Sequence, residues 1–264
     1  MVKMESRYTD RERYFNELAQ TSREFYIDYI GSHKDLGKGC RVLEIGCGEG
    51  GNLLPFAELG CTVTGLDLAP KKIENARKFF AGRGYNGEFS CSDFLSDTPP
   101  PGDMLYDIII IHDVIEHIEP ESKRLFFERA GLYMKRDGII FFGFPAWQMP
   151  FGGHQQICRS RLSRLPFIHL LPKGLYRAWL KALKENPAQI DELLSIKRSK
   201  MTPESFESMV RTEGYEIIDR TLWLITPHYK AKFGLKPRRL ASPFRNLPYI
   251  RNFLTTSCFY IIRR

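Results

Sequence analysis

Two histidines and two carboxylates follow an unbroken apolar run at a spacing that could bind a metal ion. His112, Asp113, Glu116 and His117 come directly after that run, which ends at position 111. If Asp113 opens a helical turn, the residues three and four places later lie on its side of the turn. Carboxylates and imidazoles without a thiolate suit a divalent cation such as Mg²⁺, Mn²⁺ or Fe²⁺. We therefore expect a metal site of Asp113, Glu116 and His117, with His154 from a later glycine-containing loop as the fourth ligand.

The same side chains could also act without a metal. An alkyl hydroxyl is a weak nucleophile at neutral pH, so a reaction at its oxygen needs a general base or a metal that lowers its pKa. His154 and His117, with Glu116 beside them, are the candidate catalytic residues. The plainer alternative is that Glu116 and His117 only cap a turn and shape a pocket. His112 is expected in the pocket wall, with its backbone facing a cofactor.

A glycine-rich turn lies between an expected strand and an expected helix. Within residues 42–51, Gly46 and Gly48 allow positive φ and let a ligand lie against bare backbone. The following helix offers unpaired N–H groups, and Asp67 at the end of the next strand could bind two ribose hydroxyls. Gly46, Gly48 and Gly51 also satisfy the G-x-G-x-x-G pattern of dinucleotide-binding proteins, with Asp67 about 20 residues on. The spacing alone therefore permits an NAD-dependent oxidoreductase.

Three further features favour a ligand other than NAD. Glu44 lies two residues before the first glycine, where a carboxylate can face an amino group but would repel a pyrophosphate. A second polar turn, Ser92-Asp93-Phe94, follows the third expected strand and could hold an adenine amino group beside an aromatic ring. The chain also ends in a strand that can pair at one end of the sheet. Together these features favour a cofactor that has both an amino group and an adenine.

Strands and helices are expected to alternate along the first half of the chain and so to position these residues. The expected strands cover residues 41–45, 62–66, 87–91, 106–111 and 138–144, and the helices cover 50–59, 70–81 and 121–134. This alternation predicts an α/β fold whose mostly parallel sheet is covered by helices on both faces. Strands at 216–225 and 254–263 would complete a doubly wound, Rossmann-like sheet of seven strands with an antiparallel last strand.

We expect one domain with two insertions. Residues 1–36 have the spacing of an N-terminal helical cap, residues 37–144 form the cofactor-binding core, and residues 145–200 form a helical lid. Residues 201–264 supply the C-terminal strands and a basic insertion at 226–251. Thr202 is expected to cap the helix at 203–212.

These segments resemble, in their order, the class I S-adenosylmethionine-dependent methyltransferases. VLEIGCGEG resembles the first motif of that family, GLDLAP the second, CSDF the adenine turn and YDIIIIHDVIEHI the fourth. The resemblance implies a single methyltransferase domain over residues 1–264, with S-adenosylmethionine as the cofactor. It implies that Glu44, Gly46 and Gly48 line the methionine part, Asp67 the ribose, and Asp93 with Phe94 the adenine, and that Cys47, Leu68 and His112 also face the cofactor.

The segment with the two histidines carries a second resemblance. An acid followed by Glu116 and His117, with a further histidine past the next strand, resembles the metal site of small-RNA 2′-O-methyltransferases. It is also similar to the E-x-x-E-H segment of the ubiquinone-biosynthesis O-methyltransferases, although this chain has the shorter Asp113 where both families have Glu. The resemblance implies O-methylation of a hydroxyl on a glycan, a lipid-linked or a quinone-like small molecule. An RNA 2′-O-methyltransferase and a non-catalytic binding protein stay open as alternatives.

Charge divides the chain into an acidic first half and a strongly basic second half. Residues 1–144 hold 18 Lys and Arg against 23 Asp and Glu, whereas residues 145–264 hold 21 against 8. The basic half is expected to meet an anionic acceptor, and nucleic acid ranks lower because no RNA-binding module is recognisable. Residues 162–185 mix Trp and Leu with Lys and Arg and resemble the membrane-touching insert of ubiquinone O-methyltransferases. Peripheral membrane contact and an amphipathic lid are the two interpretations of this segment.

The location predicted from the sequence is the cytoplasm, with peripheral contact at the inner face of a membrane as the further interpretation. No apolar run reaches the ~20 residues of a membrane span. The charged first residues lack the apolar core of a signal peptide. The six cysteines form no C-x-x-C pair and are typical of buried thiols in a reducing compartment.

Overall fold

The N-terminal part of the computed structural model is a helical segment that packs on one face of the sheet. The structure describes residues 10–264. Helix α2 (Arg11–Thr21) is followed by a π-helical turn (Ser22–Tyr26) and by α3 (Ile27–Gly31). The expected cap at residues 1–36 is therefore helical from Arg11 to Gly31, and residues 1–9 of it lie outside the described part.

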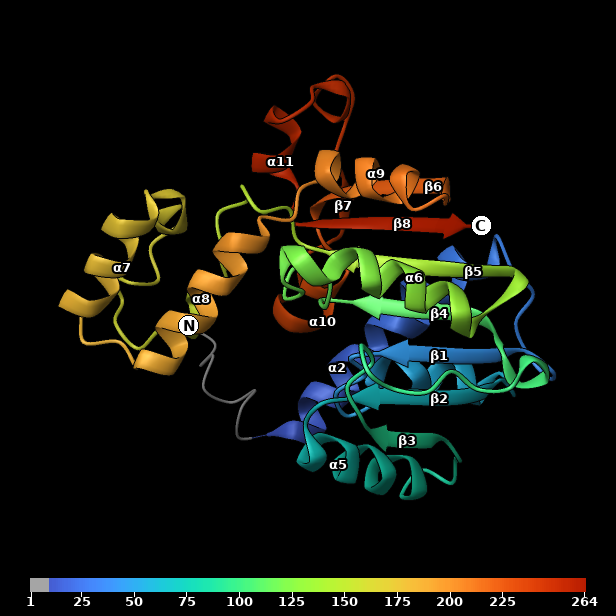
Figure 1. Cartoon of the computed structure of the whole chain (residues 1–264). Coiled ribbons are helices and arrows are strands. Elements are labelled where there is room, and N and C mark those ends of the chain that lie inside the picture. The colour runs from blue at the N-terminus through green and yellow to red at the C-terminus, as the bar shows by residue number, and fades with distance from the viewer. Residues whose placement is uncertain (1–9) are drawn as a thin grey trace.

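Five parallel strands form the half of the sheet that carries the site. They are β1 (Arg41–Ile45), β2 (Thr62–Asp67), β3 (Glu88–Cys91), β4 (Tyr106–His112) and β5 (Met134–Phe144). Their order is β3-β2-β1-β4-β5, so the direction of strand addition reverses between β1 and β4. Such a switch point creates a crevice at the carboxyl ends of the strands. This edge faces left in Figure 1.

Three C-terminal strands extend the sheet to eight strands in the described part of the chain, where we expected seven. They are β6 (Glu216–Ile225), β7 (Arg238–Arg239) and β8 (Ser257–Arg263), and the order continues β5-β8-β6-β7. β8 is antiparallel to both β5 and β6, as predicted for the last strand. β7 consists of two arginines and has no apolar alternation, so no pattern in the sequence predicts it. The last strand starts later than expected because α11 (Ile250–Leu254) precedes it.

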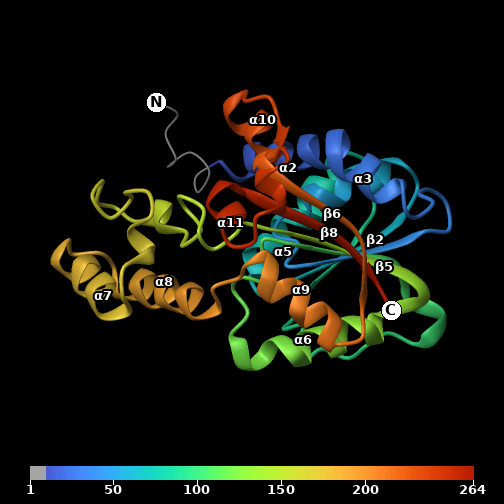
Figure 2. The ribbon, with the colours of Figure 1, turned by 90° about the horizontal axis from the view of Figure 1, so that it is seen from above.

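Helices cover both faces of the sheet, as the alternation predicts (Figure 2). With α2 and α3, the helices α4 (Leu54–Glu58) and α5 (Pro70–Ala81) pack around one core. Helices α6 (Lys123–Tyr133) and α9 (Pro203–Thr212) pack around the core on the opposite face. Thr202 caps α9 in a capping box with Ser205, which confirms the predicted start of that helix.

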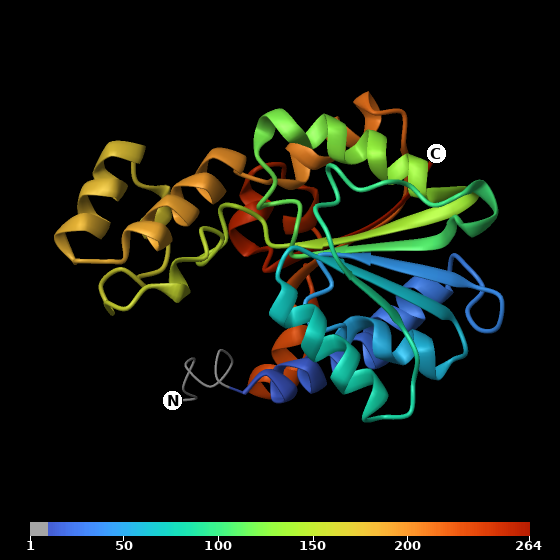
Figure 3. The same cartoon turned by 60° about the horizontal axis from the view of Figure 1, so that its bottom comes forward.

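Residues 145–200 form a helical insertion that stands beside the sheet. Helices α7 (Lys173–Ala182) and α8 (Pro187–Ser199) pack on one another around Tyr176, Leu180 and Leu193. Figures 1 and 3 show both helices beyond the carboxyl edge of the parallel strands. The insertion therefore has a small core of its own next to the expected site.

The remaining elements are short. Helix α10 (His228–Phe233) lies in the basic insertion. Within residues 10–264, single 3₁₀ turns cover Gly51–Leu53, Gly102–Met104, Pro120–Ser122, Gln155–Ile157, Ile168–Leu170 and Phe244–Asn246. In this described part, none of the helices has the length and apolar character needed to span a membrane.

Candidate active site

The glycine-rich turn after β1 folds tightly over the ends of two neighbouring strands. The N–H groups of Gly46 and Cys47 donate hydrogen bonds to the carbonyl oxygen of Leu66, at 2.7 and 3.0 Å. Gly46 has a φ of +74°, and a Cβ there would lie 2.4 Å from Cγ2 of Val114. Only glycine therefore fits at this position. The close approach places the turn directly against the segment that follows β4.

Asp67 holds the glycine-rich turn from the end of β2. Its carboxylate accepts hydrogen bonds from the N–H groups of Gly48 and Ala69, both at 2.9 Å. Nζ of Lys72 lies 3.7 Å from Oδ2 of the same carboxylate. Asp67 also lines a cavity. Because each carboxylate oxygen can accept a second hydrogen bond, Asp67 can still bind hydroxyl groups of a ligand there.

A cavity of about 290 Å³, the cofactor cavity, lies where β1, β2 and β4 end. Five predicted cofactor residues line it, namely Gly46, Asp67, Leu68, Asp93 and Phe94. The ring of Phe94 is held from behind by Phe126 and Tyr133, with ring centroids 5.2 and 5.0 Å away. Sequence reasoning missed several other lining residues, namely Ile45, Leu66, Leu95, Val114, Ile118, Ser122 and Phe126. Most of these are apolar, and packing in the core explains such residues equally well.

Glu44, the next-to-last residue of β1, is 1% exposed and does not line the cofactor cavity. Its Oε1 accepts a hydrogen bond from Nδ2 of Asn52 at 2.7 Å, whereas Oε2 has no hydrogen-bond partner among residues 10–264. Burial raises the pKa of Glu44 to about 8. An unpaired, buried carboxylate oxygen is costly, so a ligand that brings an ammonium group would relieve this cost.

Three other predicted cofactor residues contribute differently. Gly48 is held by Asp67 through its backbone, and Cys47 is buried, with its sulfur so close to Gly65 that a Cβ there would lie 2.7 Å from it. His112 faces a second cavity, described below, on the other side of the turn after β4. Cys47 and Gly48 therefore support the glycine-rich turn, and neither of them lines the cofactor cavity.

Glu116, His117 and His154 come together from the turn after β4 and the loop after β5. One possible ligand atom of each lies within 4.8 Å of the others. Nε2 of His154 lies 3.7 Å from Oε1 of Glu116, and the two imidazole rings are perpendicular, with centroids 4.9 Å apart. Neither carboxylate oxygen of the buried Glu116 has a hydrogen-bond partner in the described part of the chain. Two unsatisfied oxygens beside two imidazoles fit a divalent cation.

Burial shifts the pKa values in this triad. Burial and the nearby carboxylate of Asp113 raise the pKa of Glu116 well above its ordinary value. Burial lowers the pKa of His154 to about 4 and also lowers the pKa of His117. Both imidazoles are therefore neutral at pH 7, the form that binds a metal ion or accepts a proton.

Asp113, the predicted first ligand, is not brought into the triad. It has a φ of +53° where the sequence predicts a residue that opens a helical turn, and the turn closes one residue later, between Val114 and His117. Its side chain is 52% exposed, and Oδ2 lies 3.5 Å from Nδ1 of His112. The left-handed backbone thus separates Asp113 from the three residues that do meet.

Close packing of the loop after β5 carries His154 into the triad. A Cβ at Gly153 would lie 2.3 Å from Cβ of His169. Nε2 of His169 donates a hydrogen bond to the carbonyl oxygen of Trp147 at 2.8 Å, which ties the ring to the start of the same loop. His169 is therefore a buried packing residue, and the glycine lets the loop fold back over the end of β4.

A second cavity of about 460 Å³, the acceptor cavity, shares His117 with the cofactor cavity. Four predicted residues line it: His112, Asp113, His117 and His154. The rest include three residues of the basic insertion, His228, Tyr229 and Lys232. Sequence reasoning missed the others, which include Arg11, Tyr14, Lys72, Met149, Phe151, Gln156, Glu192 and Ser257. The residues of both groups come from α2, α5, α8, α10, the loop after β5 and the start of β8, and no local pattern joins segments so far apart. A ligand in one cavity can meet a ligand in the other at His117.

Residues 42–138 match a family model described as a methyltransferase domain. The ubiquinone biosynthesis O-methyltransferase of Vibrio vulnificus (strain YJ016) is 31% identical over 139 residues, which cover 53% of this chain and 57% of that protein. The enzyme of that name from Actinobacillus pleuropneumoniae serotype 5b (strain L20) is 29% identical over 119 residues, or 44% of this chain and 50% of that protein. The chain thus spans about half the length of the curated relatives it matches.

Solved structures share the fold over a longer stretch. An S-adenosylmethionine-dependent methyltransferase from Clostridium acetobutylicum ATCC 824 superposes with a TM-score of 0.58 at 10% identity, covering 93% of this chain and 91% of that chain. Magnesium protoporphyrin IX methyltransferase from Synechocystis PCC 6803 with bound SAH gives 0.55 at 14% identity, covering 94% and 84%. At this identity the likeness shows the fold alone, and it confirms the predicted Rossmann-like α/β fold.

Proposed function

We propose that this chain, which carries an S-adenosylmethionine-dependent methyltransferase domain, transfers the cofactor's methyl group to a hydroxyl oxygen. The observation that carries the proposal is the meeting of two cavities at His117. One cavity is lined by predicted cofactor residues, and the other holds the carboxylate–imidazole triad. The matched curated relatives are O-methyltransferases by name, which supports a hydroxyl acceptor. The acceptor class we infer is a glycan, a lipid-linked or a quinone-like small molecule.

The residues around the cofactor cavity fit S-adenosylmethionine. When bound, this cofactor supplies a methyl group on a positively charged sulfur. Asp67 would accept hydrogen bonds from the ribose hydroxyls, and Phe94 would lie beside the adenine. The unpaired Oε2 of Glu44 would receive the ammonium group of the methionine part. NAD brings no ammonium group to this oxygen, which argues against the oxidoreductase alternative.

The triad in the acceptor cavity can activate a hydroxyl in one of two ways. Glu116, His117 and His154 would hold a divalent cation, which lowers the pKa of a hydroxyl bound to it. The two unsatisfied oxygens of Glu116 support this alternative. Without a cation, the neutral ring of His154 would accept the hydroxyl proton instead. In both cases the cavity walls must hold the acceptor oxygen in line with the bond that breaks.

Cationic side chains around the acceptor cavity support an anionic acceptor. Arg11, Lys72 and Lys232 line it together with the carboxylates of Asp113 and Glu192, and Arg11 also pairs with Glu49. Lys72 is 44% exposed and lies beside Asp67, at the boundary with the cofactor cavity. Positive charge on several walls of one cavity attracts a phosphate or a carboxylate group. An acceptor that carries such a group next to its hydroxyl would use both features of the cavity.

Exposed apolar side chains at two places support a peripheral contact with an anionic membrane. Eight such residues, here called the apolar surface, are 40–67% exposed: Leu162, Leu165, Phe167, Phe244, Leu247, Tyr249, Ile250 and Phe253. The two groups meet at Phe167 and Phe253, whose ring centroids are 6.4 Å apart. Exposed cations flank them in the sequence at Arg161 and Arg245. Apolar side chains flanked by cations are typical of segments that bind anionic lipid.

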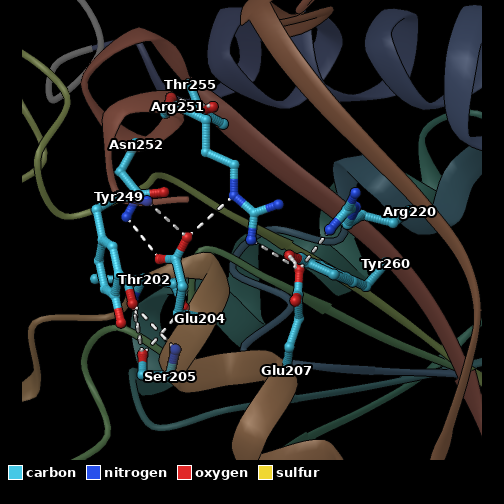
Figure 4. A network of polar contacts seen from close by, with 10 residues as sticks. All are labelled: Thr202, Glu204, Ser205, Glu207, Arg220, Tyr249, Arg251, Asn252, Thr255 and Tyr260. Atoms are coloured by element: carbon cyan, nitrogen blue, oxygen red, sulfur yellow. Dashed lines mark hydrogen bonds and ion pairs between the residues drawn. The ribbon is translucent and has the colours of Figure 1, made fainter. Parts of the chain in front are cut away.

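A buried polar network holds part of the apolar surface in place, as Figure 4 shows. Glu204 and Glu207 of α9 accept hydrogen bonds from donors on α11, its preceding loop and two strands: Tyr249 N–H, Arg251, Asn252, Arg220 and Tyr260. The side chain of Arg251 is 6% exposed, whereas Ile250 and Phe253 on the same helix are 56% and 44% exposed. Helix α11 therefore turns its charge inward and its apolar residues outward, the reverse of an ordinary surface helix.

Equilibrium binding separates the proposed function from its alternatives. Calorimetry should show micromolar or tighter binding of S-adenosylhomocysteine (SAH) and no binding of NADH, and the opposite result would overturn the proposal. A non-catalytic binding protein would bind SAH but form no product. With S-adenosylmethionine and 3,4-dihydroxybenzoate, an anionic catechol, the wild type should form a methylated product and His154→Ala should not. His33→Ala, which alters a histidine paired with Asp219 away from both cavities, is the matched control.

A further inference from the structure

A series of three side chains reaches from the N-terminal helical segment to the wall of the acceptor cavity. The hydroxyl oxygen of Tyr26 lies 2.7 Å from Nε2 of His112. On the other side of the ring, Nδ1 lies 3.5 Å from Oδ2 of Asp113. Tyr26 is buried, whereas Asp113 is 52% exposed and lines the cavity together with His112. The series therefore connects the core to the place where we propose that the acceptor binds.

The hydrogen atoms of this series have one arrangement that satisfies them. Tyr26 is 1% exposed, and burial holds its pKa well above the ordinary value, so the hydroxyl keeps its proton. Among the described residues, His112 is the hydrogen-bond partner of this hydroxyl, so the O–H group donates to Nε2. A neutral imidazole that accepts at Nε2 carries its own proton on Nδ1. That nitrogen lies 3.5 Å from Oδ2 of Asp113, within reach of an electrostatic contact.

The ring of His112 fits only because the residue paired with it on the next strand is a glycine. Gly143 is paired with His112 across β4 and β5, and a Cβ there would lie 2.3 Å from Cδ2 of the ring. Tyr26 is the last residue of the π-helical turn, an irregularity that is frequent at functional sites. Asp113 has a φ of +53°, which few residues other than glycine adopt. Two backbone irregularities, the π-helical turn at Tyr26 and the positive φ of Asp113, thus lie along one series of contacts, and irregularities of both kinds are frequent at functional sites.

We propose that Tyr26 and His112 are positioning residues that orient the carboxylate of Asp113 so that it accepts a hydrogen bond from the acceptor hydroxyl. This inference rests on the proposed function. It gives Asp113 a role other than the metal ligation expected from the sequence, in agreement with its place outside the triad. A hydroxyl that is bound both by Asp113 and by the triad has few orientations left, which favours an in-line displacement.

The tautomer of His112 tests this proposal without an acceptor. In ¹⁵N-labelled, SAH-saturated protein, NMR should show the His112 proton on Nδ1. Tyr26→Phe keeps the aromatic ring but removes the hydroxyl, so the ring should lose this single tautomer. Tyr29→Phe is the matched control, because Tyr29 lies in the same helical segment and donates to Asp219 instead. A wild-type ring protonated on Nε2, or an unchanged tautomer in Tyr26→Phe, would overturn the proposal.

Kinetics test the consequence for the acceptor. With 3,4-dihydroxybenzoate as the probe, Tyr26→Phe should lower kcat about tenfold or more while the KM for S-adenosylmethionine stays within about twofold, since small displacements of a reacting group have effects of this size. Asp113→Asn should lower kcat at least as much. A Tyr26→Phe variant with unchanged kcat would contradict the positioning role. If the wild type methylates no hydroxyl probe at all, the proposed function fails, and the NMR result still decides whether the series orients Asp113.

Discussion

A single buried carboxylate, that of Glu44, is expected to make the stability of the protein depend on pH. Burial raises its pKa to about 8, from an ordinary value of 4.5. Between these two pH values the folded protein holds the proton of Glu44, whereas the unfolded chain has released it. The free energy of unfolding therefore falls as the pH rises through this window, by up to ~1.4 kcal/mol per pH unit. The loss is complete above the higher of the two values.

The variant Glu44→Gln keeps a hydrogen-bond acceptor for Asn52 but cannot ionise. Denaturant titrations should show that its stability relative to the wild type increases as the pH is raised from ~5 to ~8. Its affinity for SAH should fall about tenfold or more, because the charge-assisted bond to the ammonium group is lost. Calorimetry at pH ~6.5 in buffers of different ionisation enthalpy should show about one proton released on SAH binding by the wild type. Equal proton release by Glu44→Gln would refute this coupling.

Two loops from neighbouring strands must fold against one another to form the triad. We predict that chelator-stripped, SAH-saturated protein binds Mn²⁺ or Mg²⁺ at one site, measured by calorimetry. His154→Ala removes one of the three groups that meet, so the affinity should fall about tenfold or more, the range that even outer-shell changes produce. Asp113→Ala should leave the affinity within about twofold, because this carboxylate lies outside the triad.

His33→Ala is the matched control for the metal titration, since this ring pairs with Asp219 at 3.1 Å and lines neither cavity. The absence of saturable binding in the wild type would discard the metal and leave His154 as the general base. A loss in Asp113→Ala as large as that in His154→Ala would restore the four-ligand site expected from the sequence.

Elements with a strong apolar pattern are predictable from the sequence, and elements held by distant partners are not. The predicted strands at 41–45 and 216–225 and the helices at 70–81 and 203–212 have the predicted bounds in the structure. Burial imposes a periodicity on each of them. Strand β7 exists only through its pairing with β6, and α11 hides its arginine because Glu204 and Glu207 of α9 accept from it. A local pattern carries no information about such partners.

In the candidate site too, local features could be predicted from the sequence, and contacts between distant segments could not. The glycine-rich turn and Asp67 are predictable because one tight turn fixes the backbone of Gly46 and Gly48 and brings Gly48 to the carboxylate of Asp67. The helical spacing assumed for Asp113 is wrong, because its backbone is left-handed and the turn starts one residue later. The contact between Tyr26 and His112 joins residues that are 86 positions apart, so no motif contains it. Local geometry could be predicted here, whereas contacts between elements needed the fold.

At the scale of the whole molecule, four helices that follow β5 in the chain gather at one edge of the sheet. Figures 1 and 2 place α7, α8, α10 and α11 around the carboxyl ends of the parallel strands. These helices belong to the half of the chain that holds 21 Lys and Arg against 8 Asp and Glu. The apolar surface therefore belongs to the basic half of the chain, whereas residues of both halves line the acceptor cavity. An anionic lipid surface bound at the apolar surface could present an acceptor to the triad.

The apolar surface is predicted to bind vesicles that contain anionic lipid. The protein should sediment with vesicles of phosphatidylglycerol and phosphatidylcholine but only weakly with phosphatidylcholine alone, and added salt should reduce binding because it screens the cations. The triple variant Tyr249→Ser, Ile250→Ser and Phe253→Ser should bind about tenfold more weakly or worse, since each side chain loses apolar area that would enter the bilayer. It leaves the side chains of Arg251 and Asn252, which anchor α11, unchanged.

The double variant Leu125→Ser and Leu132→Ser is the matched control, because these residues of α6 are 44% and 55% exposed and do not belong to the apolar surface. It should bind vesicles as the wild type does. If the triple variant also bound unchanged while retaining SAH affinity, the membrane contact at α11 would be wrong. The outward-facing apolar residues would then have to cover another protein or the acceptor itself, and a loss of turnover without a loss of vesicle binding would identify the acceptor as that partner.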